Sequence, residues 1–451
     1  MTAPSAPERQ TLGARHARVW ALAGPIILSN LSTPLLGAVD TAVVGHLPDA
    51  AYIGGVAVGA VIFNFLYWGF GFLRMGTTGF TAQAFGAEDT AELRAALARP
   101  LLLAFVLGAL LVFLQAPVGW LAFALFEASD QVEDFARSYY AIRIWSAPAA
   151  LANYAMLGWL LGTRRAGAVL LIQLVLNGIN ILLDLVFVIG LGWGVEGVAL
   201  ASLLAELGAM VLGLAVVARA LNTGGGSWEW ARIASPERLA VLLRANLDIF
   251  IRTLCLLGAF AYFTARSATM GDVLLAGNAI LLQLQSFTAY GLDGFAHAVE
   301  VLAGNALGAR SRPAFREAVR VSTLWALGTA GAVTGIYLVL GGSIVALFTD
   351  LEAVRRAAEI YLPWVVVAPL VSVWSFQLDG IFIGVTRTRD MRNAMMLSLA
   401  IYLGACWVLV PTLGNHGLWL AFTILMVARA ATLGWLYPRL ERSVGADGAG
   451  A

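Results

Sequence analysis

The sequence is poor in charge, and it contains no lysine. Of its 451 residues, 12% are charged and 60% are hydrophobic, and the mean hydropathy is +0.81. A soluble domain carries roughly 25% charged residues, so water cannot be the solvent for most of this surface. The composition predicts a protein that crosses a membrane many times. The net charge of +1 provides no basic field for nucleic acid.

Cysteine and the common catalytic motifs are also scarce or missing. The two cysteines, Cys255 and Cys406, lie in apolar runs, so neither a disulfide framework nor a zinc site is expected. The phosphate-binding loop G-x-x-x-x-G-K-[ST] and the H-E-x-x-H and G-x-S-x-G motifs are absent. We therefore expect no enzyme, no cofactor and no ATP hydrolysis. An intramembrane aspartyl protease built on Asp40 and Asp184 is the enzymatic alternative.

Apolar runs of membrane length recur along the chain, and twelve membrane-spanning helices are predicted. The first run is too long for the apolar part of a signal peptide, so it is expected to be retained. The predicted spans are 19–45, 52–80, 96–116, 136–161, 167–190, 194–220, 240–265, 273–302, 318–341, 354–384, 393–411 and 416–437. Of the 28 arginines, 20 fall on one side of these spans, and the positive-inside rule predicts that this side, with both termini, is cytoplasmic.

The chain repeats itself with a constant shift of 222 residues. FGA at 85–87 matches LGA at 307–309, and Gly158, Gly162 and Arg165 match Gly380, Gly384 and Arg387. A constant shift across loops and helices indicates duplication. Because each copy has six spans, both have the same topology, and an axis along the membrane normal should relate them. The predicted units are an N-lobe over 1–221, a cytoplasmic linker over 222–238 and a C-lobe over 239–451.

Polar side chains in the first half fall at helical spacing, which places them on faces that avoid lipid. Span five carries Gln173, Asn177, Asn180 and Asp184 at positions i, i+4, i+7 and i+11. Span one carries Asp40 together with Pro25 and Pro34, and proline permits a helix to bend. At the shift of 222, Asp40 meets Tyr262 and Asp184 meets Cys406. The acid pair belongs to one half only, which leads to the hypothesis of an ion-handling site there.

Two ions could serve this site. A carboxylate in a cavity of low dielectric constant can take up a proton near neutral pH. A sodium ion could instead sit between Asp40, Asp184 and neutral oxygens such as those of Asn180 and Ser202. Either event couples an ion gradient to a conformational change, and the choice between H⁺ and Na⁺ stays open. No other metal is expected.

The second half carries a separate polar cluster in spans seven, eight and ten. Its members are Asp248, Arg252, Asp293, Glu300 and Asp379. Asp248 and Arg252 lie four residues apart on one helix, so we expect these two side chains to pair with each other.

Four stretches of the chain resemble the DinF-like branch of the multidrug and toxic compound extrusion (MATE) family. These are VDTAVVGHL (39–47), LRMGTTGFTAQAFGA (73–87), LDGFAHAVE (292–300) and LDGIFIGVTRTRDMRN (378–393). The resemblance implies twelve helices in two six-helix lobes around a central cavity. It also implies a rocking exporter that exchanges amphipathic, often cationic, compounds for inward-moving H⁺ or Na⁺.

The resemblance further implies which residues do the coupling. The implied site is Asp40, Asn180 and Asp184, which Asn153 and Ser202 would complete, with Pro25 where helix one bends. Other branches place a coupling glutamate on helix seven. Here that helix has Asp248 and Arg252 but no glutamate, which weakens the case for a second sodium site of that kind.

Two alternatives to an exporter remain at this point: a lipid-linked flippase of the same superfamily and a passive channel. A flippase would need basic residues in its cavity for phosphate. Among the ionisable residues that we place inside the membrane, acids outnumber arginines, which favours cationic cargo: Asp40, Asp184, Glu206, Asp248, Asp293, Glu300 and Asp379 against Arg74, Arg143, Arg252 and Arg429. We expect a monomer in a bacterial inner membrane, with lipid and a small molecule as its partners.

Overall fold

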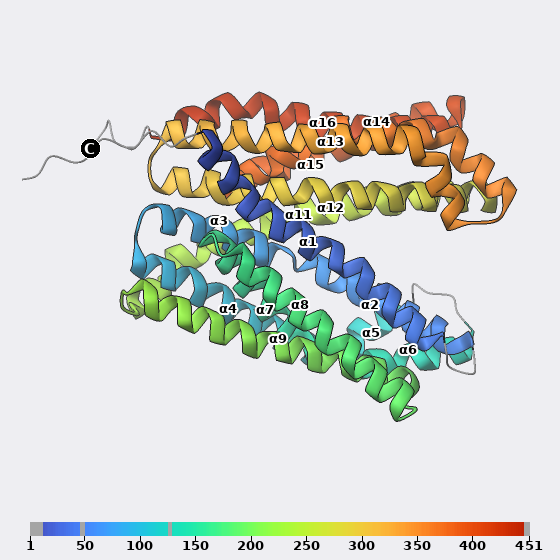
Figure 1. Cartoon of the computed structure of the whole chain (residues 1–451), viewed down its shortest axis with the longest axis horizontal. Coiled ribbons are helices and arrows are strands. Elements are labelled where there is room, and N and C mark those ends of the chain that lie inside the picture. The colour runs from blue at the N-terminus through green and yellow to red at the C-terminus, as the bar shows by residue number, and fades with distance from the viewer. Residues whose placement is uncertain (1–11, 46–49, 125–128, 446–451) are drawn as a thin grey trace, which may run out of the picture.

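The computed structural model is a bundle of long helices, and it has no strand among residues 12–45, 50–124 and 129–445, which are the residues it describes (Figure 1). The side chains of residues 12, 33–36, 38, 40, 41 and 50 also lie outside the description. The elements are α1 (Leu12–Val44), α2 (Ala50–Gly69), α3 (Phe72–Gly86), α4 (Thr90–Phe113), α5 (Gln115–Phe123), α6 (Asp130–Arg143), η1 (Ile144–Ser146), α7 (Ala147–Gly162), α8 (Ala166–Asp184), η2 (Leu185–Gly190), α9 (Gly194–Gly224), α10 (Trp230–Ile233), α11 (Pro236–Ala268), α12 (Asp272–Gly308), α13 (Arg312–Phe348), α14 (Glu352–Gly384), α15 (Thr388–Leu413) and α16 (Asn415–Ser443).

Within the described residues these elements build the twelve predicted spans, which confirms the all-α membrane fold. Span two consists of α2 and α3, which meet at a break around Phe70 and Gly71, and span four consists of α6, η1 and α7. Among the described residues, nine of these spans are helices long and apolar enough to cross a membrane on length and composition alone. The other three are α1, the α6–α7 rod and α11.

The helices continue beyond the apolar runs that mark them in the sequence. Span nine, predicted over 318–341, is α13, which has 37 residues. Its start is set by Ser311, whose hydroxyl accepts a hydrogen bond from the backbone N–H of Ala314 at 3.3 Å. Asp89 and Ser235 cap α4 and α11 in the same way. Such caps satisfy backbone donors at helix starts, so the caps rather than the edge of the apolar run set where these helices begin.

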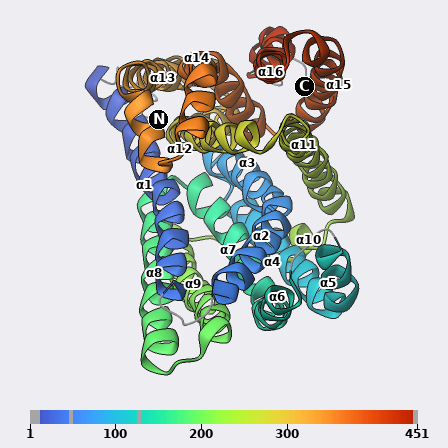
Figure 2. The same ribbon diagram turned by 90° about the vertical axis from the view of Figure 1, so that its right-hand side faces the viewer.

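The rods form two bundles, and α1 crosses both of them (Figures 1 and 2). Elements α2–α9 make one bundle and α11–α16 the other. α1 packs along α8 of the first bundle and along α12 of the second. The short helix α10 lies between the bundles in sequence and packs on α4, where Arg99 donates to the carbonyl oxygen of Arg232 at 2.8 Å. Helix one is therefore a physical connection between the two halves.

The backbone repeats at the same shift of 222 residues as the sequence. Among the described residues, four that are not glycine have a positive φ: Glu88 (56°), Arg164 (61°), Arg310 (52°) and Thr386 (55°). They form two pairs at this shift, Glu88 with Arg310 and Arg164 with Thr386. The loops after α3, α7, α12 and α14 thus turn in the same way in both copies. We call the end of the bundle that carries these loops the basic end.

At the basic end, α3 and α12 approach each other in a nearly symmetrical contact. A Cβ atom added to Gly86 would lie 2.0 Å from the carbonyl oxygen of Asn305, and one added to Gly308 would lie 1.9 Å from that of Gln83. Gly86 and Gly308 are equivalent at the shift of 222, as are Gln83 and Asn305. Membrane helices come this close only where small residues face each other.

The same residues exchange hydrogen bonds between the bundles. Gln83 Nε2 donates to the carbonyl oxygen of Gly384 at 3.0 Å, and Asn305 Nδ2 donates to that of Gly162 at 3.3 Å. Gly162 and Gly384 are the last residues of α7 and α14, and the last carbonyls of a helix have no partner within it. We call these six residues the interlobe clasp: Gln83, Gly86, Gly162, Asn305, Gly308 and Gly384.

The clasp should open when a side chain is added to it. In Gly308→Ala the new Cβ collides with a backbone carbonyl, and such overpacking costs about 1–3 kcal/mol. We expect spin labels placed on the two bundles at the basic end to show a larger population of long distances. Gly328→Ala is the control, because its Cβ would have nothing within 4 Å. Identical distance distributions in the two variants would contradict the close contact.

Candidate functional site

One face of α8 carries a ladder of polar side chains. Gln173 Nε2 donates to Asn177 Oδ1 at 3.2 Å, and Asn177 Nδ2 donates to Ser32 Oγ of α1 at 2.9 Å. Asn180 Nδ2 donates to Ser202 Oγ of α9 at 3.2 Å. The ladder is buried at Asn177, Asn180 and Ser202. The predicted stripe is therefore one continuous polar face that links α8 to both α1 and α9.

Asp184 lies at the end of this ladder, where α8 also ends. Its side chain is fully buried, and the next six residues form the π-helical segment η2. π-Helical turns are rare and frequently mark functional sites. Burying a carboxylate is costly unless a proton, a cation or hydrogen-bond donors compensate its charge. The position of Asp184 fits a group that handles an ion.

Asp40 and Pro34, both predicted as site residues, have side chains outside the described part of the chain. Their backbones belong to α1, which packs on α8. α1 is an uninterrupted α-helix from Leu12 to Val44, although it contains both Pro25 and Pro34. In this conformation neither proline ends the helix, and bending at these positions stays a prediction.

Asn153 forms a hydrogen bond with Glu206, an acid that is not among the predicted site residues. Its Nδ2 donates to Oε2 of Glu206 at 2.8 Å and to the backbone oxygen of the same residue at 3.1 Å. Glu206 lies one helical turn after Ser202 on α9, so this pair adjoins the ladder. In the sequence, the i, i+4 spacing of Glu206 from Ser202 is the pattern that could have indicated its place beside this site. The N-lobe site therefore contains a further carboxylate next to the predicted residues.

In the second half, two arginines bind one aspartate. Arg252 of α11 and Arg429 of α16 both donate to Oδ2 of Asp379 on α14, with Arg429 at 2.5 Å. All three residues are at least nine-tenths buried. The expected pairing of Asp248 with Arg252 is wrong. Asp248 instead accepts from Arg392 Nη1 at 2.6 Å, because α15 supplies a closer arginine than its own helix does.

The remaining members of the predicted second cluster lie on α12, facing the other bundle. Oε2 of Glu300 is 2.8 Å from Nδ1 of His297, and Nη1 of Arg74 on α3 is 3.4 Å from the same nitrogen. Asp293, one turn earlier, is within electrostatic range of Arg74 and Arg252. Asp293 is also within electrostatic range of His297 and Asp379, so four of the five predicted members, all but Asp248, remain connected. Asp248 stands apart with Arg392, and the α12 acids take part in the contact between the bundles.

The comparisons with known proteins agree with this architecture. The MatE family model matches residues 25–186 and 249–408, and the chain belongs to this family. It is 43% identical to DNA damage-inducible protein F of Escherichia coli (strain K12), over 94% of this chain and 92% of that protein. It is 26% identical to the probable multidrug resistance protein NorM of Xanthomonas campestris pv. campestris, over 99% of each chain.

A solved structure described as the outward-facing conformation of a multidrug resistance MATE family transporter of the MOP superfamily has the same fold. The TM-score is 0.86 at 21% identity, and the match covers 96% of this chain and 99% of that one. The family consists of transporters and not of enzymes. The chain is accordingly a multi-pass membrane transporter for a small molecule, and the resemblance that its motifs indicate is confirmed.

Removing the charge of Asp379 should destabilise the second half strongly. Asp379→Asn leaves two buried guanidinium groups without their counter-charge, and breaking a buried pair costs about 3–5 kcal/mol. We expect a large fall in the thermal unfolding midpoint of the purified protein. The double variant Asp379→Asn with Arg429→Met should lose less than the single variant, because it removes one of the stranded charges.

The matched control removes an exposed partner. Glu352→Gln breaks the ion pair with Arg356 on the same helix, where both side chains are largely exposed. Exposed pairs contribute roughly 0–1 kcal/mol, so this variant should unfold almost like the wild type. Equal stability of Asp379→Asn and Glu352→Gln would contradict the arrangement around Asp379.

Proposed function

We propose that this transporter is a secondary multidrug exporter of a bacterial inner membrane, which exchanges amphipathic or cationic compounds for H⁺ or Na⁺. The observation that carries the proposal is Asp184, a fully buried carboxylate at the end of the polar ladder on α8. The names of two relatives, both described as multidrug resistance proteins or transporters, support the class of substrate. Asp40 and Asp184 are the proposed coupling acids, with Asn180, Ser202 and Asn153 around them.

The ladder offers a route from ion binding to movement. Ser32 of α1 accepts a hydrogen bond from Asn177, so α1 is tied to the ladder of the N-lobe. Nearer the start of α1, Trp20 packs edge-on against Phe295 of α12. Asn30 Nδ2 lies 3.4 Å from the carbonyl oxygen of Tyr290, which also belongs to α12. A change of charge at the coupling acids therefore acts on a helix that also contacts the C-lobe. Bending at Pro25 or Pro34 would transmit that change.

The coupling ion acts in one half only. Burial disfavours the charged form of a carboxyl group, so uptake of a proton or a cation stabilises it, and the oxygens of Asn180 and Ser202 could help to bind a cation beside Asp184. In the C-lobe, Asp379 already has two arginine partners. A third cation there would meet two like charges, so we place no ion site at Asp379. This asymmetry supports one coupling site per chain.

In this proposal, the state of the clasp determines whether the transporter is open to the cytoplasm. If the basic end faces the cytoplasm, as the positive-inside rule predicts, a closed clasp corresponds to a transporter that is closed to the cytoplasm. Loading from the cytoplasm then requires the clasp to open. The contributing elements of the ladder and the clasp all come from one chain, so we propose that the monomer is the working unit.

Neutralising either coupling acid should abolish coupled export. Asp40→Asn and Asp184→Asn keep the shape of the side chain but can neither bind a proton in the working range nor supply a negative ligand. We expect dye export from reconstituted liposomes to fall at least about tenfold, which corresponds to about 1.4 kcal/mol, while membrane insertion stays normal. Asp350→Asn, which changes an exposed loop acid, is the control. Wild-type export by Asp40→Asn and Asp184→Asn would remove these acids from the mechanism.

The driving ion can be identified in the same liposomes. Export of a cationic dye is measured under a pH gradient alone and under a sodium gradient alone. We expect one of the two gradients to drive export, with a fixed exchange ratio, because one site binds one coupling ion. Ion conductance without exchange would identify a passive channel, and movement of lipid-linked phosphates would favour a flippase. Absence of dye export under both gradients would contradict an antiporter.

A further inference from the structure

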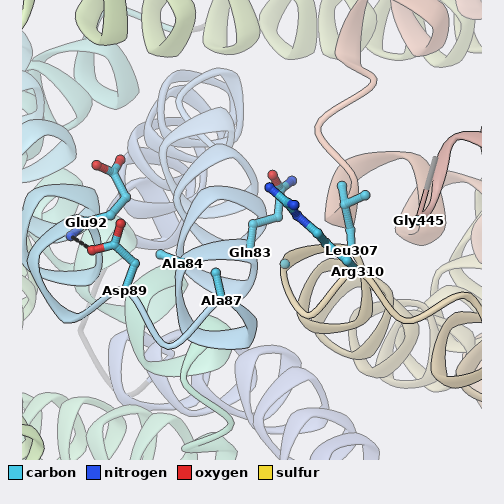
Figure 3. Close-up of a pocket in the computed structure, with 9 residues that line it drawn as sticks. Gln83, Ala84, Ala87, Asp89, Glu92, Leu307, Arg310 and Gly445 are labelled. Atoms are coloured by element: carbon cyan, nitrogen blue, oxygen red, sulfur yellow. Dashed lines mark hydrogen bonds between the residues drawn. The ribbon is translucent and has the colours of Figure 1, made fainter. Parts of the chain in front are cut away.

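Two pockets flank the clasp at the basic end, and they are related by the internal repeat. The first has a volume of about 360 Å³ and is shown in Figure 3, where Asp89 and Glu92 lie on one side of Gln83 and Arg310 on the other. The second has a volume of about 290 Å³. Equivalent residues line both: Gln83, Ala87 and Glu92 in the first correspond to Asn305, Ala309 and Ala314 in the second.

The two pockets have diverged in charge. The first contains Asp89 and Glu92, and both acids already have arginine partners, Arg232 at 2.7 Å and Arg99 at 2.9 Å. At the positions equivalent to Asp89 and Glu92 the second half has Ser311 and Ala314, and three arginines from other parts of the chain line the second pocket. These are Arg15 and Arg18 of α1 and Arg164 of the loop between α7 and α8. Since the equivalent pocket lacks them, the repeated scaffold does not require these arginines.

Among the described residues that line the second pocket, arginines outnumber acids. Glu317 of α13 is the acid that lines it, and its carboxylate lies 3.2 Å from Arg15. Burial, and after it the like charge of Arg18, lower the pKa of Arg164. The guanidinium groups of Arg18 and Arg164 therefore repel each other in this pocket. An anion between them would relieve that repulsion, and arginine binds phosphate groups well because its donors form a planar fork.

The pocket also offers one hydrogen-bond acceptor. Asn305 is 2% exposed and uses its Nδ2 in the clasp, while its Oδ1 accepts no hydrogen bond from any residue that the structure describes. A buried acceptor without a donor is costly. The oxygen is buried in this structure, so the amide must turn toward the pocket before the hydroxyl group of a ligand can supply that donor. The pocket thus combines sites for an anionic group and for a neighbouring hydroxyl.

We propose that the second pocket binds the phosphate group of a hydroxyl-bearing ester, with Arg18 and Arg164 on the phosphate and Asn305 on the hydroxyl. Basic pockets between membrane helices at the cytoplasmic side bind anionic lipid headgroups, and a glycerol-phosphate headgroup has this chemistry. The walls of the second pocket come from α1, from the loop after α7 and from α12 and α13. The ligand therefore bridges both halves beside the clasp and stabilises its closed form.

The test uses the full chain in nanodiscs of phosphatidylcholine, with and without phosphatidylglycerol. We expect phosphatidylglycerol to raise the unfolding midpoint and to shorten the spin-label distances across the clasp. In Arg18→Gln with Arg164→Gln, binding of the anionic lipid should weaken at least tenfold. Glu317→Gln should bind it more tightly, because Arg15 then becomes available. A purely structural role of these side chains would not produce opposite signs in the two variants.

Two further arms separate the source of the phosphate and the specificity of the pocket. Inorganic phosphate and glycerol 3-phosphate are added to the protein in neutral detergent. A response to these soluble ions equal to that of the lipid assigns the site to free phosphate esters, and a response to the lipid alone assigns it to the membrane. Arg310→Gln in the first pocket and Arg165→Gln beside Arg164 are the controls. The same loss in the controls as in the double variant, or no response in the wild type, overturns the proposal.

Discussion

The structure depends on a backbone contact between α3 and α12. Gly86 and Gly308 each face a carbonyl oxygen at a distance that no Cβ could occupy, so the two helices can meet only because both positions lack side chains. Gln83 and Asn305 then satisfy helix-terminal carbonyls of the opposite bundle. The clasp residues themselves are uncharged, and the charged groups between α3 and α12, which are Arg74, His297 and Glu300, lie earlier along the two helices. A contact made of close packing and a few hydrogen bonds, including one from Gln83 to Thr386 Oγ1, can open at low cost, as the proposed alternating access requires.

The two halves solve the problem of buried charge differently. In the C-lobe, Asp379 is neutralised inside the protein by Arg252 and Arg429, which fixes α11, α14 and α16 to each other. In the N-lobe, Asp184 lies at the end of a ladder of neutral amides and hydroxyls. Such groups can stabilise a carboxylate, a carboxylic acid or a bound cation with small rearrangements. Under the proposed function, the C-lobe is a rigid counterpart and the N-lobe is the half that responds to the ion.

Features that depend on a single helix or on the internal repeat could be predicted from the spacing of residues in the sequence. The polar face from Gln173 to Asp184 follows from helical periodicity, and the shift of 222 residues already contained Gly162 and Gly384 of the clasp. The pairing of Asp248 with Arg252 failed because the competing partner, Arg392, belongs to α15 and becomes a neighbour only after folding. Asn153 and Glu206 are 53 residues apart and meet for the same reason. Hydropathy also misses helix ends, since capped polar turns continue past the apolar run.

The charges around the clasp follow from its symmetry. Duplication produced two equivalent pockets, and a closed clasp brings both to the same end of the molecule. In the first pocket, partial burial opposes ionisation of Asp89, but the Glu92 N–H and Arg232 hold the pKa of this carboxyl below its usual value. Asp89 therefore stays charged at neutral pH and ties the segment around α10 to α4. In the first pocket, Asp89 and Glu92 pair with arginines of the chain itself, whereas Arg15, Arg18 and Arg164 line the second pocket from positions that are not equivalent to these acids. The repeated backbone beside the clasp glycines thus carries acids bound within the chain on one side and, under our proposal, a site for an external anion on the other.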